Sequence, residues 1–330
     1  MNKNRIEELD VLRGIAALSV ILFHYTSKYD EVFTPKIFST FEFKYGYLGV
    51  QLFFIISGFV IFMTINKVKS GKEFVYKRFI RLYPTFWICL FFTFLITSFA
   101  NIERFERSIT ELLINITMVP DLFKTKPIDG AYWSLLPEII FYSFIWLIYK
   151  LKLINKIEWI GLIWIIISLL LKIYVKNDIL NLLFITDYAY LFVAGINFYK
   201  IYVKQSTILN HIIIIIALIT SYIFNDITES ILCTAFFCLF YLLSFNKLIG
   251  LKKLKPLVFV GVISYALYLT HQFFGLILIN KLSLLGVTNY YILLLTPLLI
   301  SIFIAWIITV YLDKLVSNLF KKVLNLNAKN

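Results

Sequence analysis

Long apolar stretches, separated by short polar connections, dominate the pattern of residues along the chain. Ten of these stretches approach or reach the length of about 20 residues that an α-helix needs to cross a bilayer. They cover residues 9–29, 47–66, 80–100, 133–150, 157–175, 179–199, 208–225, 228–246, 256–280 and 290–313. The pattern therefore predicts an all-α fold, a polytopic membrane helical bundle of about ten transmembrane helices.

Composition supports a membrane protein and decides how the charge is interpreted. Hydrophobic residues make up 60% of the chain and charged residues only 15%, whereas soluble domains have about 45–50% and about 25%. Most of the 32 lysines and arginines lie in alternate connections, starting with the N-terminal segment. By the positive-inside rule both termini are cytoplasmic. We expect the net charge of +13 to face anionic membrane lipid, with no nucleic-acid partner, in a multi-pass protein of the plasma membrane.

The connections and cysteines leave little room for other kinds of site. The longest connection, 101–132, contains a moderately apolar piece, Leu112–Val119, which is too short to span and predicts a re-entrant or interfacial segment. All three cysteines lie in apolar stretches without the spacing of a metal site or a disulfide framework, so no metal is expected. Residues 1–315 are expected to form one membrane domain and residues 316–330 a short basic cytoplasmic tail, with no appended soluble domain.

The first apolar stretch carries three polar residues that are costly in lipid: Asp10, Arg13 and His24. A charge near the centre of a membrane helix costs roughly 2.5–3.5 kcal/mol. Arg13 and His24 are eleven positions apart, about 1100° of rotation and 16 Å of rise, so they share a helix face at two depths. Such a pair suits a long ligand with an anionic end and a reactive end. Alternatively, Arg13 anchors the topology and His24 is an interfacial structural residue.

The second and third stretches add small residues and a pair of arginines. Gly46, Gly49, Ser57 and Gly58 favour close helix packing, and Gln51 is the polar exception that could face a cavity. Arg78 and Arg81 are three positions apart and share a helix face. Pro84 is expected near the first turn of the third helix, which would place both arginines beside its N-terminus. Guanidinium groups there would bind phosphate, or they only hold the topology.

Later stretches contain further polar residues at membrane depth. Glu138 follows Trp133 and Ser134 by about one turn, and the antiparallel direction of its helix predicts a depth similar to that of His24. A carboxylate can orient and charge an imidazole, or Glu138 is a solvated residue at a helix start. Ser264, Tyr268 and His271 follow at i, i+4 and i+7 and share a helix face, where they either contact a substrate or are structural.

Five segments, in this order, resemble the membrane acyltransferase-3 family over roughly residues 6–315: LDVLRGIAALSVILFHY, YLGVQLFFIISGFVIF, FVYKRFIRLYPTFW, YWSLLPEIIFY and GVISYALYLTH. The resemblance implies a multi-spanning O-acyltransferase that takes an acyl group, usually acetyl from acetyl-CoA, and transfers it to a carbohydrate. The family pattern matches Arg13, His24, Glu138 and the pair Arg78 and Arg81. Some members append a soluble esterase-like domain after the last span.

The resemblance and the residue pattern together give one mechanistic hypothesis. Coenzyme A enters from the cytoplasm with its phosphates near Arg78 and Arg81, helped by Arg13. His24 acts as general base on a sugar hydroxyl, or takes the acyl group itself, and Glu138 orients it. Two other functions fit the membrane spans: a transporter or exporter of a polysaccharide or acyl intermediate, and a non-catalytic membrane subunit.

Overall fold

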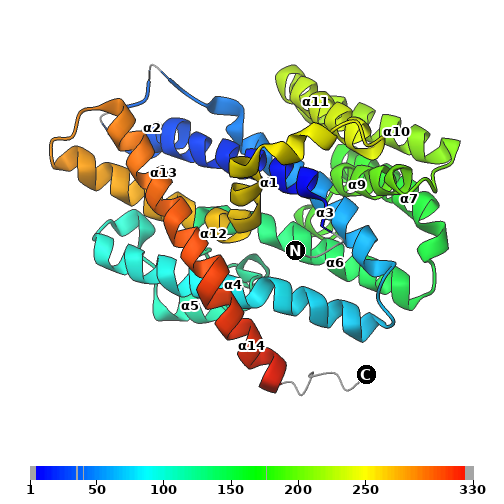
Figure 1. Cartoon of the computed structure of the whole chain (residues 1–330), viewed down its shortest axis with the longest axis horizontal. Coiled ribbons are helices and arrows are strands. Elements are labelled where there is room, and N and C mark those ends of the chain that lie inside the picture. The colour runs from blue at the N-terminus through cyan, green and yellow to red at the C-terminus, as the bar shows by residue number, and fades with distance from the viewer. Residues whose placement is uncertain (1–4, 35, 40, 176, 324–330) are drawn as a thin grey trace. The chain divides into compact units, whose positions relative to one another are not determined.

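The computed structural model describes residues 5–323 except positions 35, 40 and 176, and over these residues the chain is helical without a strand (Figure 1). The all-α prediction is thereby confirmed. The α-helices are α1 (Glu7–Phe23), α2 (Tyr29–Val32), α3 (Gly49–Ile65), α4 (Gly71–Ala100), α5 (Ile109–Asn115), α6 (Leu135–Lys150), α7 (Ile157–Leu170), α8 (Asp178–Phe184), α9 (Ala189–Tyr202), α10 (Ile208–Phe224), α11 (Ile227–Ser244), α12 (Lys255–Leu284), α13 (Tyr290–Ile307) and α14 (Asp313–Val323).

Shorter 3₁₀ and π segments join these helices. The 3₁₀ segments are η2 (Lys44–Leu48), η3 (Glu103–Phe105), η4 (Pro120–Phe123), η5 (Gly130–Ser134), η6 (Ile154–Lys156) and η8 (Ile249–Lys253). The π segments are η1 (His24–Lys28), η7 (Leu171–Val175) and η9 (Ile308–Leu312). Because η1 continues directly from α1 and runs into α2, the first membrane helix is one run from Glu7 to Val32.

Nine helical runs in the described part of the chain are long and apolar enough to cross a membrane. They correspond to nine of the ten predicted spans and confirm a multi-pass membrane fold. The tenth predicted span is α10, an apolar helix of 17 residues. At 1.5 Å per residue it measures about 26 Å, just short of a hydrocarbon core of about 30 Å.

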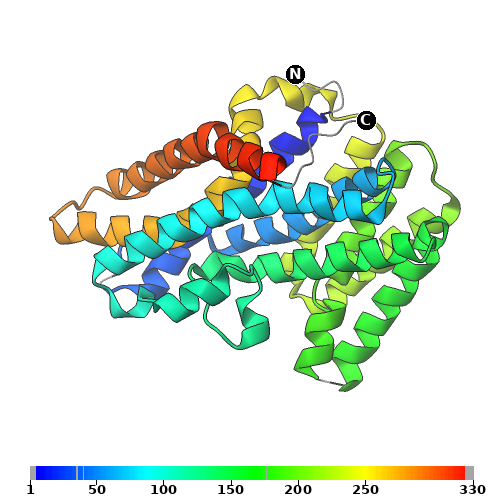
Figure 2. The ribbon, with the colours of Figure 1, turned by 90° about the horizontal axis from the view of Figure 1, so that it is seen from below.

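Helix α4 begins earlier than the apolar pattern predicts. It runs unbroken for 30 residues from Gly71 (cyan in Figure 2), about 45 Å and longer than the lipid core is thick. Lysine, arginine and glutamate are good helix formers, so the helix extends beyond its apolar part. Pro84 therefore lies inside the helix, and the predicted position of Arg78 and Arg81 beside a helix N-terminus is wrong.

The last helix also extends further than predicted. Residues of the expected C-terminal tail continue the run from α13 through η9 into α14, which ends at Val323. The rest of that predicted tail, 324–330, lies outside the described residues. In the 101–132 connection, the predicted non-spanning segment Leu112–Val119 begins within the seven-residue helix α5, whose start is capped by Ser108 and Glu111.

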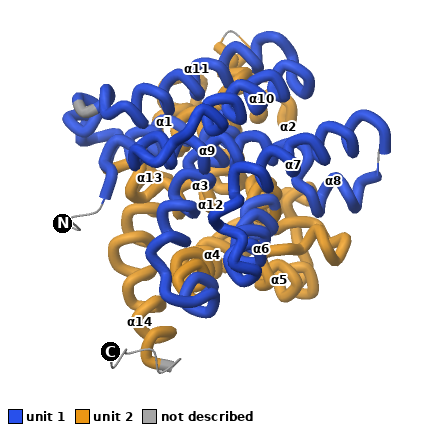
Figure 3. The backbone as a smooth tube through the Cα atoms, turned by 90° about the vertical axis from the view of Figure 1, so that its right-hand side faces the viewer, with its two compact units in different colours: residues 1–16, 48–75, 137–258 blue, residues 17–47, 76–136, 259–330 orange. Residues whose placement is uncertain are grey.

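The chain divides into two compact units (Figure 3). Unit 1 comprises residues 1–16, 48–75 and 137–258, and unit 2 comprises residues 17–47, 76–136 and 259–330. The first membrane helix contributes its N-terminal part to unit 1 and the remainder to unit 2.

Unit 1 is organised around the close crossing of α3 and α9. A Cβ atom on Gly58 would lie 2.2 Å from the Phe192 carbonyl oxygen, and one on Gly195 would lie 2.1 Å from the Ile55 carbonyl oxygen. Only glycine allows the two backbones to approach so closely, which confirms the predicted packing role of Gly58. The fully buried amides of Asn197 and Asn210 then join α9 to α10 through a 2.8 Å hydrogen bond.

Unit 2 contains a similarly close contact between α12 and the residue after His24. A Cβ atom on Gly275 would lie 2.0–2.3 Å from ring and hydroxyl atoms of Tyr25. The Tyr25 side chain is fully buried, and its hydroxyl donates to the His271 carbonyl oxygen at 3.0 Å and lies 2.8 Å from Ser301 Oγ. These contacts fix α12 and α13 against the first membrane helix at the level of His24.

Candidate functional site

Two histidines from distant parts of the sequence meet inside unit 2. His24 Nδ1 lies 3.1 Å from His271 Nε2 and 2.9 Å from the Val20 carbonyl oxygen. His271 is fully buried in α12, and its Nδ1 lies 2.7 Å from the Tyr268 carbonyl oxygen. His24 begins the π segment η1, and π turns inside α-helices occur frequently at functional sites.

The backbone carbonyls assign the proton positions on both rings. A carbonyl oxygen only accepts, so the Tyr268 carbonyl requires a proton on Nδ1 of His271. Neutral His271 then carries its lone pair on Nε2, and this atom accepts a hydrogen bond from Nδ1–H of His24. The Val20 carbonyl oxygen accepts a second hydrogen bond from the same Nδ1–H group. The lone pair of neutral His24 is therefore on Nε2. This is the tautomer that a general base working through Nε2 needs.

The sequence predicted that His271 either contacts a substrate or is structural, and it did not single out Tyr25. The structure brings His24 and His271 together and holds the His271 backbone through Tyr25. An aromatic residue within an apolar stretch carries no signal of such a contact. A histidine at membrane depth does carry one, because its polar ring needs partners there.

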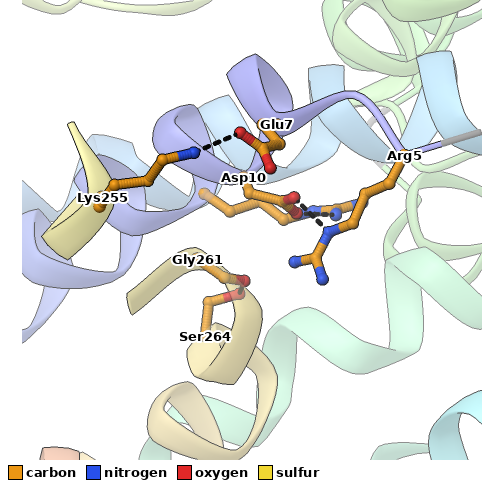
Figure 4. Close-up of polar contacts among 7 residues, drawn as sticks. Arg5, Glu7, Asp10, Lys255, Gly261 and Ser264 are labelled. Carbon is orange, nitrogen blue, oxygen red and sulfur yellow. Dashed lines mark hydrogen bonds and ion pairs between the residues drawn. The ribbon is translucent and has the colours of Figure 1, made fainter. Parts of the chain in front are cut away.

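The other residues predicted on the His271 face have local partners. The Tyr268 hydroxyl donates to the Ala131 carbonyl oxygen at 3.1 Å and lies 2.8 Å from Ser134 Oγ, so it joins α12 to η5. Ser264 Oγ donates to the Gly261 carbonyl oxygen at 2.9 Å (Figure 4), a structural bond within α12. Trp133, the predicted residue next to Ser134 in η5, is 40% exposed.

Asp129 is a buried carboxyl group that the sequence analysis missed. It caps η5 by accepting from Ala131 N at 2.9 Å, and it also accepts from Phe273 N at 3.0 Å. Burial raises the pKa of Asp129 to about 7, although the two backbone N–H donors act in the opposite direction. An aspartate directly before glycine at a helix start was the available signal, since aspartate is a preferred N-cap.

The two arginines of α4 also lie in unit 2. Arg81 is exposed and Arg78 is half-buried, both inside the helix. Any affinity for phosphate there comes from the guanidinium groups themselves, because the partial charge of a helix N-terminus acts only within about its first turn.

In unit 1, Asp10 has a structural role. It is 2% exposed and accepts from Arg5 Nε at 2.5 Å and from Arg13 Nη1 at 3.1 Å. Figure 4 shows Asp10 with Arg5, and beside them the bond of 2.9 Å from Lys255 Nζ to Glu7. One carboxylate shared by two arginines leaves a net positive charge beside Arg13.

The remaining predicted residues of unit 1 are Glu138 and Gln51. Glu138 Oε1 accepts a 2.9 Å hydrogen bond from Ser57 Oγ and another from the Tyr142 hydroxyl. Gln51 is 7% exposed, and its Oε1 has no hydrogen-bond partner among the residues described. Because Glu138 and His24 belong to different units, the pairing of these two side chains stays a prediction.

Comparison with known proteins gives a consistent family. A family model described as an acyltransferase domain matches residues 6–311. A protein of Acidianus two-tailed virus, named "Putative acetyltransferase ORF330", is 28% identical over 156 residues, which is 47% of this chain and 44% of the viral protein. The chain thus spans less than half the length of that relative. No solved structure matches the chain.

Proposed function

Because the chain belongs to the acyltransferase-3 family, we propose that it transfers an acyl group, in the first instance acetyl, from cytoplasmic acyl-CoA to a hydroxyl group of a carbohydrate at the plasma membrane. The observation that carries this proposal is the assigned tautomer of His24. Its Nδ1–H is held by Val20 and His271, which leaves Nε2 as the basic atom.

The transfer is a substitution at the thioester carbonyl carbon. His24 Nε2 takes the proton of the sugar hydroxyl while that oxygen attacks the carbonyl carbon, forming a C–O bond. The C–S bond then breaks, and the sulfur leaves as coenzyme A after receiving the proton from His24. In between, the positive imidazolium donates from Nδ1 to the Val20 carbonyl and to His271 Nε2, which stabilises the charge. The products are the acylated sugar and free coenzyme A.

Arg78 and Arg81 are the proposed phosphate ligands for the coenzyme. Arginine forms forked, charge-assisted hydrogen bonds with phosphate, and Arg81 is exposed on α4. Arg13, which pairs with Asp10, keeps the role in coenzyme binding that the family resemblance implies. Glu138, which accepts hydrogen bonds from Ser57 and Tyr142, keeps the implied role of orienting His24.

Transfer of ¹⁴C-acetyl from acetyl-CoA to the carbohydrate fraction of native membranes, by protein purified in lipid nanodiscs, tests the reaction. His24→Ala should lower the rate roughly 10²–10⁴-fold, the usual effect of losing a general base. His211→Ala, which removes a histidine that contacts Tyr241 in unit 1, should leave the rate unchanged. A wild-type rate in the His24 variant would remove His24 from the mechanism.

The same assay examines the donor and the alternative function. Changing both Arg78 and Arg81 to alanine should raise the KM for acetyl-CoA roughly tenfold or more, whereas Lys72→Ala, on the same helix, should not. Equal KM values would make the two arginines topology anchors. If the wild-type protein consumes no acetyl-CoA but moves a labelled glycan intermediate across vesicles, it is a transporter.

A further inference from the structure

Unit 2 contains a pocket of about 240 Å³ beside the π segment that begins at His24. Its wall comes from the end of the first membrane helix, with Phe23 and Ser27, and from the following segment up to and including η2, with Tyr47. The distribution of charge along the sequence predicts that this segment lies on the outer side of the membrane, opposite the cytoplasmic face with its basic residues. None of the residues assigned to catalysis or to coenzyme binding lines this pocket.

One wall of the pocket is in contact with His24. The Phe23 ring packs edge-on against the His24 ring, with centroids 5.0 Å apart, and edge-on against the Tyr47 ring at 5.4 Å. Phe23 and Tyr47 both line the pocket. A ligand resting on these two aromatic rings is therefore separated from the His24 imidazole by a single side chain.

The pocket contains a buried hydroxyl group that a ligand could satisfy. Ser27 is 7% exposed and lines the pocket, and its Oγ has no hydrogen-bond partner in the described part of the chain. A buried polar group without a partner costs free energy. A ligand hydroxyl group that bonds to Ser27 would recover this energy.

The charged groups of the lining balance one another. Asp30 and Glu42 line the pocket together with Lys36 and Lys44, and a third acid, Glu31, has its own ion pair with Lys28 at 2.5 Å. Carboxylates only accept hydrogen bonds and ammonium groups only donate them. A lining with both kinds and no clear excess of charge suits a neutral ligand whose groups donate and accept, which is the property of a sugar hydroxyl.

The shape of the pocket is held independently of any ligand. Both carboxylate oxygens of Asp30 accept from backbone N–H groups, Ile37 N and Phe38 N, each at 2.8 Å. These bonds tie the loop to the helix end and preorganise the site. The volume is below the roughly 300–1,000 Å³ of pockets for drug-sized ligands, so the space admits one sugar ring.

We propose that this pocket binds one sugar ring of the acceptor next to the ring that is acylated, as a neutral pyranoside stacked on Phe23 and Tyr47 and hydrogen-bonded to Ser27. The inference rests on the proposed function, because it assigns the acceptor to the side of His24 that the pocket wall contacts. It predicts that sugar binding depends on pocket residues and needs neither acyl-CoA nor the His24 imidazole.

Saturation-transfer NMR on the full chain in nanodiscs, without acyl-CoA, tests the pocket directly. The probes are methyl glycosides of glucose, galactose, mannose and N-acetylglucosamine. At least one should bind the wild type. Ser27→Ala should weaken that binding roughly 2- to 12-fold, the effect of one hydrogen bond, and should not lower thermal stability, because the hydroxyl is unpaired in the free protein.

Matched variants separate the pocket from the surrounding loop. Tyr47→Ala should abolish glycoside binding, whereas Tyr45→Ala, two positions away and not in the pocket lining, should not. Glu42→Gln should weaken binding, whereas Glu103→Gln, which removes an equal charge in another connection of unit 2, should not. The inference is overturned if no glycoside binds the wild type, or if binding is unaffected by the Tyr47 and Ser27 variants.

Comparison with acetyl transfer keeps this inference distinct from the proposed function. His24→Ala should lose transfer and keep glycoside binding. Pocket-dependent glycoside binding in a protein that never consumes acetyl-CoA would refute the enzyme and keep the sugar site. Acetyl transfer with an unchanged KM for the acceptor in the Ser27 and Tyr47 variants would refute the site and keep the enzyme.

Discussion

His271→Leu is the sharpest perturbation of the proposed reaction. Leucine has a size similar to histidine and is apolar, so it fills the fully buried position in α12 without adding an unpaired polar group. The substitution removes the Nε2 acceptor that lies 3.1 Å from His24 Nδ1. It leaves the Val20 carbonyl in place, so His24 keeps the same tautomer.

The expected magnitude follows from the change of charge during the reaction. A hydrogen bond between neutral groups contributes about 0.5–1.5 kcal/mol, and one that involves a charged group about 1.5–3 kcal/mol. Loss of the His271 acceptor should therefore cost about 1–1.5 kcal/mol more when His24 is an imidazolium than when it is neutral. This corresponds to a roughly 5- to 13-fold lower kcat.

The assay measures kcat and the KM for acetyl-CoA in nanodiscs. The KM should not change, because the coenzyme phosphates are assigned to α4. His271→Gln, which restores a side-chain acceptor, should recover most of kcat. His211→Leu makes the same chemical change at a histidine of unit 1 and should have no effect.

Three results would refute this reasoning. A loss of kcat above 10²-fold with an intact fold would mean that His271 takes part in the chemistry directly. An unchanged kcat would mean that the imidazolium of His24 gains nothing from His271. A lower kcat that glutamine fails to restore, together with a lower thermal midpoint, would assign His271 a packing role only.

Two further predictions concern stability, measured as thermal unfolding in detergent. Gly275→Ala should lower stability by about 1–3 kcal/mol, because the new methyl group overlaps Tyr25. Gly250→Ala should be neutral, because a Cβ atom there meets nothing within 4 Å. Equal stability of the two variants would contradict the close contact at Gly275. Since burial raises the pKa of Asp129 to about 7, its contribution to stability is complete below about pH 4 and is lost as the pH rises through 7. Between pH 5 and 8, wild-type stability should fall by up to about 1.4 kcal/mol per pH unit, and Asp129→Asn should flatten this slope; identical slopes would contradict it.

The membrane spans were predictable because the lipid core imposes a continuous apolar length. Nine predicted spans correspond to membrane-length helices, and the tenth, α10, is a slightly shorter apolar helix. Helix ends were not predictable from the same pattern. Hydropathy detects only the apolar part of α4, while the charged residues before it also favour helix. That difference placed Pro84 and both arginines at the wrong point of the helix.

The candidate site was predictable in its residue types and not in its contacts. The cost of polar groups in lipid singled out His24 and His271. The sequence offers no indication that these two rings meet, since 247 positions separate them. The same cost marked Asp10 as either a substrate or a structural residue, and two arginines hold its carboxylate. The pocket behind Phe23 combines a helix end with a loop, whose joint shape follows from the fold alone.

The π segment at His24 adds one residue to the first membrane helix. A turn closed by i→i+5 hydrogen bonds holds one residue more than the α-helical turn that it replaces. Removing one residue between His24 and Lys28 would let an ordinary α-helical turn take the place of the π turn, and the helix after it would keep its orientation. A one-residue deletion in the regular part of the same helix would instead turn every later residue by about 100°. The π segment is therefore the place where this helix tolerates a change of length best.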